Sequence, residues 1–130
     1  MGKKDRKAIV LDTGALLAFE RADPKIRALV REALRTGCRL IVPAGVIGEV
    51  WHDGVRQALL VGLLRGPTTS LPPLDYLLAE AAGILLARTG TTDVIDASVA
   101  LTARRENAAV VTSDVESIAR LDPTLEIHEI

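Results

Sequence analysis

The sequence predicts an α/β fold, a three-layer α/β/α sandwich with a mostly parallel central sheet. Short runs rich in β-branched residues alternate along the chain with segments whose apolar residues have helical spacing. The strand-like runs are apolar throughout, which is typical of strands covered on both faces. The chain has 130 residues, of which 48% are hydrophobic, and this length suits one domain spanning residues 1–130.

Five segments are predicted to form strands. The runs at residues 8–11, 40–42 and 109–112 are short, apolar and β-branched. Residues 68–71 are a weaker candidate, and residues 125–130 alternate apolar with polar side chains, as an edge strand does. Aromatic residues make up only 2% of the chain, which predicts a core of Leu, Val, Ile and Ala.

Helices are predicted between these strands. Asp23 followed by Pro24 is typical of a helix start, and Gly37 is typical of its end. A short helix carrying Glu49 follows the second strand, and the prolines of residues 66–73 indicate a loop. Further helices are expected at residues 94–106, at residues 115–121 and at residues 74–89, the last with an apolar stripe of Leu77, Leu78, Ala81, Ala82, Leu85 and Leu86.

The composition narrows the class of protein. The net charge is −1, so the chain as a whole has no electrostatic attraction for nucleic acid, although 12 of its 16 basic residues are arginine. Cys38 is the only cysteine and is expected in the core, which excludes an internal disulfide and fits the cytoplasm. No uncharged stretch approaches the ~18 residues of a membrane span, so no membrane association is expected.

Acidic residues follow several of the predicted strands. Asp12 comes directly after the first strand, Glu49 lies on the helix after the second, and Asp114 follows residues 109–112. Asp93 and Asp96 open the helix at residues 94–106 and can pack against the same edge of the sheet. Carboxylates that meet at one place repel one another unless a cation lies among them, and Mg²⁺ prefers oxygen ligands.

Each acid also has a purely structural interpretation. Asp12 can be a turn residue. Glu49 can be a solvated residue at the side of its helix, next to an apolar stripe of Val46, Ile47, Val50 and Trp51. Asp93 and Asp114 can each be an N-cap, and Asp96 an acid that the dipole of the helix favours in the first turn. No single acid decides between the two interpretations, whereas the set in this order favours a metal site.

Four stretches of the sequence resemble PIN-domain nucleases, and most closely the VapC-type toxins of toxin–antitoxin pairs. They lie at residues 9–15, 42–51, 93–97 and 110–114, so the resemblance spans nearly the whole chain. It implies a sheet with helices on both faces, a Mg²⁺ or Mn²⁺ site, and endoribonuclease activity on RNA phosphodiester bonds. It also implies two kinds of protein partner, a small antitoxin protein and a second copy of the chain in a homodimer.

The resemblance assigns roles to particular residues. The four principal acids of the family correspond, in order, to Asp12, Glu49, Asp96 and Asp114, which are implied to be catalytic and to hold the metal. Asp93 matches an acid that only some members have. The small hydroxyl residue after the first acid of the family corresponds to Thr13, and the polar position before the last acid corresponds to Ser113 or Thr112; these residues are implied to contact the substrate or to support the acids.

Two other classes of protein are disfavoured because each requires a residue that this sequence lacks. A phosphoacceptor receiver domain needs a lysine late in the chain, but the last one here is Lys25. A haloacid-dehalogenase-like phosphatase needs an Asp-x-Asp after the first strand, whereas residue 14 is Gly14. A PIN nuclease of RNA processing without a toxin role and a non-catalytic PIN module that only binds a partner stay open as alternatives.

Two features bear on how RNA would be held. Arg104 and Arg105 follow Asp96 along the same helix and can either approach an RNA backbone or complement the dipole at the helix end. The only aromatic residues are Phe19, Trp51 and Tyr76, so no stacking platform for bases is expected.

Overall fold

A five-stranded parallel sheet forms the centre of the molecule. The computed structural model describes residues 7–54 and 56–130. The strands follow the spatial order β3-β2-β1-β4-β5, and every neighbouring pair is parallel. Their bounds are β1 (Ala8–Leu11), β2 (Arg39–Ile41), β3 (Thr69–Ser70), β4 (Ala109–Thr112) and β5 (Ile127–Glu129). The predicted α/β fold with a mostly parallel sheet is confirmed.

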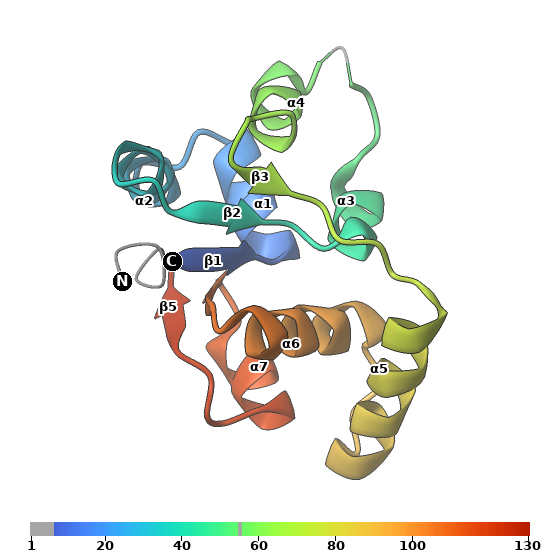
Figure 1. The fold of residues 1–130 in the computed structure, drawn as a ribbon. Helices are drawn as coiled ribbons and strands as arrows, with labels where there is room; N and C mark the ends of the chain where they lie inside the picture. Colours follow the sequence, from blue (N-terminus) through green and yellow to red (C-terminus); the bar gives the residue numbers. More distant parts are fainter. Residues whose placement is uncertain (1–6, 55) are drawn as a thin grey trace.

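Helices cover both faces of the sheet. Helices α1, α2 and α4 pack on one face, α6 and α7 on the other, α3 lies between α1 and α6, and α5 packs outside α6 and α7 (Figure 1). Their bounds are α1 (Thr13–Glu20), α2 (Pro24–Arg35), α3 (Ala44–Val50), α4 (Ala58–Leu64), α5 (Tyr76–Thr89), α6 (Val94–Glu106) and α7 (Val115–Leu121). Within the described residues, no helix is both long and apolar enough to cross a membrane.

The core is aliphatic and is centred on β1 and β4. Val10 and Leu11 of β1 and Val110 and Val111 of β4 have no exposed surface. Neighbouring residues on a strand point to opposite faces, so these strands are buried on both sides. Cys38 is buried as expected, and burial raises the pKa of its thiol.

The order of the strands changes direction at β1. The chain runs from β1 outward to β2 and β3, and then crosses back to place β4 on the other side of β1. In open parallel sheets, ligands bind at the carboxyl ends of the strands where such a reversal occurs. The topology therefore points to the carboxyl ends of β1 and β4 as the place for a site.

Most predicted elements are confirmed, with two corrections to the predicted apolar stripes. Strands β2, β3 and β5 are each shifted or shorter than predicted, and α5 begins at Tyr76 because Asp75 accepts a hydrogen bond from the backbone N–H of Leu78. Leu77 was expected in the apolar stripe of α5 but is 72% exposed. Trp51 is not part of the buried side of α3 either, because it caps that helix and is 44% exposed.

Helices α1 and α4 were not predicted. Helix α1 starts at Thr13, immediately after the N-cap Asp12, and is apolar on nearly every side because it lies between the sheet and other helices. Helix α4 is a run of seven residues, ALLVGLL, and such a short apolar run does not distinguish a strand from a helix.

A buried hydroxyl in α6 offers a test of the packing. The side chain of Thr102 has no exposed surface, and its Oγ1 is buried without a hydrogen-bond partner among the described residues. Replacing it by an apolar group of the same shape removes this cost of desolvation. We expect Thr102→Val to raise the free energy of unfolding by about 1 kcal/mol, measured by urea denaturation.

The matched control for this variant lies one turn away on the same helix. Ser98 is equally buried, but its hydroxyl donates to the carbonyl oxygen of Ile95 at 2.7 Å. Ser98→Ala is therefore expected to give no such gain. Equal responses of the two variants would show that the Thr102 hydroxyl is satisfied in the folded protein.

Candidate active site

A pocket of about 420 Å³ opens at the carboxyl ends of β1 and β4. All five acids that the sequence singled out reach it, although they come from four different segments of the chain. Among the described residues that line it there is no lysine, arginine or histidine, and the positive charge of Arg120 acts on Asp114 from outside the lining. The lining residues are Asp12, Thr13, Gly14, Glu49, Asp93, Asp96, Ser113, Asp114 and Ile118.

Asp12 links the first strand to the first helix. It is the N-cap of α1, and its Oδ1 accepts a hydrogen bond of 2.9 Å from the backbone N–H of Ala15. The residue is only 6% exposed. Burial raises the pKa of its carboxyl, and the hydrogen bond from the Thr112 side chain acts in the opposite direction. Asp12 is thus a buried carboxylate fixed by the start of a helix.

Of the two interpretations that the sequence left open, the structural one applies to Asp93, whereas Asp96 needs more than a structural explanation. Asp93 is the N-cap of α6, because its Oδ1 accepts from the backbone N–H of Asp96 at 2.9 Å. The pKa of Asp96 is raised to about 6, first by burial and then by the negative charges of Asp93, Asp12, Asp114 and Glu49. The helix dipole alone does not explain an acid at a position where four neighbouring acids oppose its ionisation.

Asp114 is the N-cap of α7. Its carboxylate accepts from the backbone N–H of Ser117 at 3.2 Å and from the Ser117 hydroxyl at 2.6 Å. These hydrogen bonds lower the pKa of Asp114, so it is ionised at neutral pH. Thr112 lies behind the lining, where its Oγ1 accepts from the backbone N–H of Asp114 at 2.8 Å. Thr112 therefore connects the carboxylate of Asp12 to the backbone of Asp114.

Glu49 approaches the pocket from α3 and is held by Thr13 of α1. The hydroxyl of Thr13 donates a short hydrogen bond to Oε1 of Glu49. Glu49 is exposed, so this bond across the pocket is what orients its carboxylate. The structure therefore brings together all the predicted site residues, with Thr112 directly behind them.

A buried glutamine that the sequence analysis missed supports the segment after Glu49. Gln57 is only 1% exposed, and its side-chain amide donates to the carbonyl oxygen of Val50 and to the Glu20 carboxylate. Its Oε1 accepts from the backbone N–H groups of His52 and Asp53 at 3.0 and 2.9 Å. Gln57 thereby fixes the exit from α3. Nothing in the sequence marked it, because its partners are mostly backbone groups.

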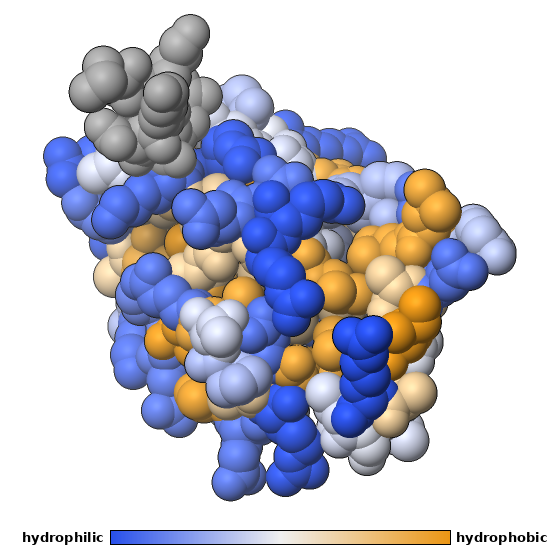
Figure 2. Space-filling model, turned by 60° about the horizontal axis from the view of Figure 1, so that its bottom comes forward, coloured by the Kyte–Doolittle hydropathy of each residue, from blue (hydrophilic) through white to orange (hydrophobic). Residues whose placement is uncertain are grey.

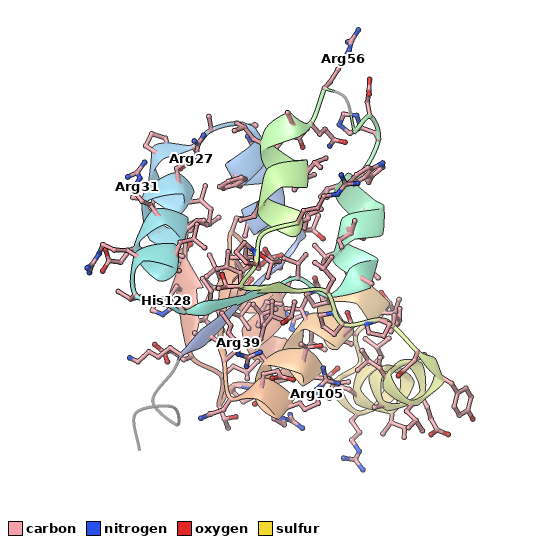
Figure 3. All side chains as sticks on the ribbon, turned by 45° about the horizontal axis from the view of Figure 1, so that its top comes forward. Arg27, Arg31, Arg39, Arg56, Arg105 and His128 are labelled. Atoms are coloured by element: carbon pink, nitrogen blue, oxygen red, sulfur yellow. The ribbon has the colours of Figure 1, made fainter. Side chains whose placement is uncertain are left out.

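The structure favours the helix-end interpretation of Arg104 and Arg105 over an approach to RNA. Both lie in the last turn of α6, whereas the pocket lies at its first turn. Arg104 pairs with the buried Asp122 at 2.8 Å. Arg105 and Arg39 lie together at this far end (Figure 3), and both pair with Glu106. Arg104 and Arg105 complement the dipole at the end of α6, and the pair of Arg39 with Glu106 connects this end to β2.

Comparison with known families identifies the family to which the chain belongs. The family profile of the PIN domain matches residues 9–122, which includes every acid of the pocket. The chain belongs to the PIN domain family. PIN domains are generally nucleases, and they typically use divalent metal ions. No curated protein matches the sequence significantly.

Solved structures share the fold of this PIN domain over nearly its whole length. VapBC2 from Rickettsia felis, bound to a DNA fragment from its promoter, aligns with a TM-score of 0.72 at 17% identity, covering 95% of this chain and 98% of the other. FitAcB from Neisseria gonorrhoeae gives 0.63 at 19%, covering 93% and 96%. FitAB bound to an IR36 DNA fragment gives 0.63 at 16%, covering 93% and 94%.

The donor set of the pocket fits a hard divalent cation. Every charged side chain in the lining is a carboxylate, and carboxylate oxygens are the ligands that Mg²⁺ and Mn²⁺ prefer. Within residues 7–54 and 56–130, no three Asp, Glu, His or Cys side chains are already arranged as a complete metal site. Mg²⁺ keeps several water molecules and binds few carboxylates directly, so it does not need a complete cage of protein ligands. The carboxylates of the lining are of the right chemical type to hold it.

The raised pKa of Asp96 makes a prediction for the metal-free protein. The folded-state pKa of about 6 lies above the ordinary value of 3.8, so the folded state loses stability as the pH rises between these values. Asp96→Asn stays neutral throughout. We expect its melting temperature in EDTA to equal that of the parent below pH 4 and to exceed it above pH 6.

Asp93→Ala is the matched variant on the same helix start. Because Asp93 caps α6, its loss should cost about 1 kcal/mol of stability at neutral pH, measured by the same thermal unfolding. If Asp96→Asn is less stable than the parent at pH 7, the repulsion inferred from the pocket is not present.

Proposed function

We propose that this PIN domain is a metal-dependent endoribonuclease that hydrolyses RNA phosphodiester bonds, with residues 1–130 acting as one nuclease domain. The observation that carries the proposal is the pocket of five carboxylates without a basic residue in its lining. Such a pocket repels a phosphate unless a cation is present. The membership in a family of nucleases supports the same function.

Each acid of the pocket has a proposed role in holding the metal or orienting the attacking water. Asp12 and Asp96 are proposed to hold Mg²⁺ or Mn²⁺, partly through water, with Asp114, Glu49 and Asp93 around them. The metal, when bound, supplies positive charge at a phosphate oxygen. Asp114 or Glu49 accepts a hydrogen bond from the attacking water and orients it, and Glu49 is itself kept in place by Thr13.

Metal-dependent cleavage tests this proposal directly. The purified protein is expected to cleave single-stranded RNA with Mg²⁺ or Mn²⁺ and to lose that activity in EDTA. Asp96→Asn should reduce cleavage roughly 100-fold because it removes charge that holds the cation. The control is Glu126→Gln, whose carboxylate pairs with His128 far from the pocket. A folded, metal-loaded parent that leaves RNA intact would favour the non-catalytic binding module.

A small antitoxin is the proposed protein partner. The similar structures, VapBC2 and FitAB bound to DNA fragments, support an antitoxin for this chain. A basic side chain of such a partner suits the pocket, because a guanidinium can take the place of the cation among carboxylates. Inhibition of a nuclease toxin would then follow from occupation of the acids.

A homodimer is proposed from the outward face of α5. Of the whole helix only Ala82 is buried, whereas Tyr76, Leu77 and Ile84 are 75%, 72% and 52% exposed. Figure 2 brings this side of the molecule forward and shows apolar side chains gathered where α5 lies. An exposed apolar helix face of this kind is typical of a surface that contacts another protein.

Charge on the same face favours a second copy of the chain as the cover. Its only charged residues are Glu80 and Arg88, which lie four residues on either side of Ile84. If two α5 helices pack antiparallel about Ile84, each Glu80 faces the Arg88 of the other copy. Gly83 leaves open space beside this point, so the helices can approach closely.

Introducing charge into the apolar face of α5 tests this dimer. Leu77→Glu together with Ile84→Glu should convert a dimer into a monomer, measured by light scattering, because it places acids within an apolar contact. The control is Leu34→Glu, a residue on α2 that is 50% exposed and distant from α5. A parent protein that is monomeric at high concentration would contradict the proposal.

A further inference from the structure

Four hydroxyl groups stand in or next to the acidic pocket, and three of them are engaged with carboxylates. Thr13 donates to Glu49, Ser117 donates to Asp114, and Thr112 hydrogen-bonds Asp12. Ser113 is the exception. Its side chain lines the pocket and is exposed, and within the described part of the chain its hydroxyl has no hydrogen-bond partner. The hydroxyl of Ser113 is therefore available to a ligand of the pocket.

The position of this hydroxyl depends on a glycine in another element. A Cβ atom placed on Gly14 of α1 would lie 2.3 Å from Oγ of Ser113 and 3.4 Å from its Cβ. The Ser113 hydroxyl thus occupies the space that a side chain at residue 14 would fill. The same Cβ would be 3.6 Å from Oδ1 of Asp12, so the Ser113 hydroxyl and the Asp12 carboxylate both border the space beside Gly14.

The charges of the pocket decide what this hydroxyl can bind. Among the described residues, its lining offers a phosphate no lysine or arginine, and Arg120, which acts on Asp114, lies outside the lining, so within the pocket a bound cation and neutral donors are what can meet phosphate oxygens. Among the side-chain hydroxyls, Ser113 alone is not already committed to a carboxylate. We infer that Ser113 binds the RNA substrate, with its Oγ–H donating a hydrogen bond to a non-bridging phosphate oxygen, and that Gly14 provides the space in which it does so.

This inference rests on the proposed nuclease function and adds a substrate-binding residue to it. Thr13, Thr112 and Ser117 position carboxylates, whereas Ser113 touches the substrate. A hydrogen bond of this kind forms in the bound substrate as well as during the reaction, so its loss weakens binding more than turnover. The signature of Ser113 is therefore a change in KM at nearly constant kcat.

The experiment compares Ser113→Ala with Ser113→Thr on a single-stranded RNA oligonucleotide that the parent cleaves with Mn²⁺. Loss of one neutral hydrogen bond weakens binding by about three- to tenfold. We expect Ser113→Ala to raise KM by that factor, with kcat and the affinity for Mn²⁺ unchanged. Ser113→Thr keeps a hydroxyl and should restore much of the lost binding.

A double-mutant cycle with Gly14 tests the geometry. Gly14→Ala displaces the hydroxyl, a flexible group that can rotate away without unfolding the protein, and should raise KM as Ser113→Ala does. When Ser113 is already alanine, the nearest atom to the new methyl group is Cβ at 3.4 Å, an ordinary contact. The second substitution should then add little to the first.

Three outcomes would overturn the inference. Unchanged KM in Ser113→Ala would show that the hydroxyl does not touch RNA. A parallel loss of Mn²⁺ affinity would make it part of the metal site instead. Fully additive effects in the cycle would separate Gly14 from Ser113. A parent protein that cleaves no RNA would instead overturn the proposed function, so the two failures are distinguishable.

Discussion

Mutual repulsion among carboxylates is the constraint on which the site of this protein depends. Parallel strands end at one edge of the sheet, and the reversal of strand order at β1 brings Asp12 and Asp114 to neighbouring positions there. Helix α6 adds Asp93 and Asp96 from the other side. The raised pKa of Asp96 is the direct physical expression of this crowding. The fold accepts an unfavourable charge distribution where a cation would make it favourable.

Helix capping is what makes this crowding structurally tolerable. Asp12, Asp93 and Asp114 are the N-caps of α1, α6 and α7, so each accepts hydrogen bonds from the backbone N–H groups of its helix. Those bonds and the positive end of the helix dipole make an Asp side chain favourable at each of these helix starts. An oxygen that accepts one hydrogen bond retains a lone pair for a metal or for water. The structural and the functional interpretations of these acids are therefore compatible at three positions.

The same compatibility does not extend to Asp96 and Glu49. Asp96 lies in the first turn of α6 without capping it, and burial together with four negative neighbours opposes its ionisation. Glu49 relies on the single hydroxyl of Thr13, and the segment that follows it relies on Gln57. Both acids are held by the tertiary structure, and Asp96 is held at some cost to its stability, which is typical of residues retained for function.

Much of the fold could be predicted from local sequence. The buried strands β1 and β4, the start of α2 at Asp23 and the left-handed ends of α2 and α5 at Gly37 and Gly90 follow from short-range chemistry. The order of the acids along the chain also predicted which of them reach the pocket, because strands of one parallel sheet end at the same edge.

What local sequence could not decide depends on contacts between distant segments. Helix α1 is apolar on nearly all sides, so only its burial between sheet and helices distinguishes it from a loop or strand. The exposure of Leu77 and the pairing of Arg104 with Asp122 depend on where α5 and α7 pack. The free hydroxyl of Ser113 depends on the absence of a side chain at Gly14, 99 positions earlier in the chain. The sequence by itself determined which chemistry is present, and the tertiary structure decided which groups remain free to use it, because hydrogen bonds and charges act over a few ångströms of space rather than along the chain.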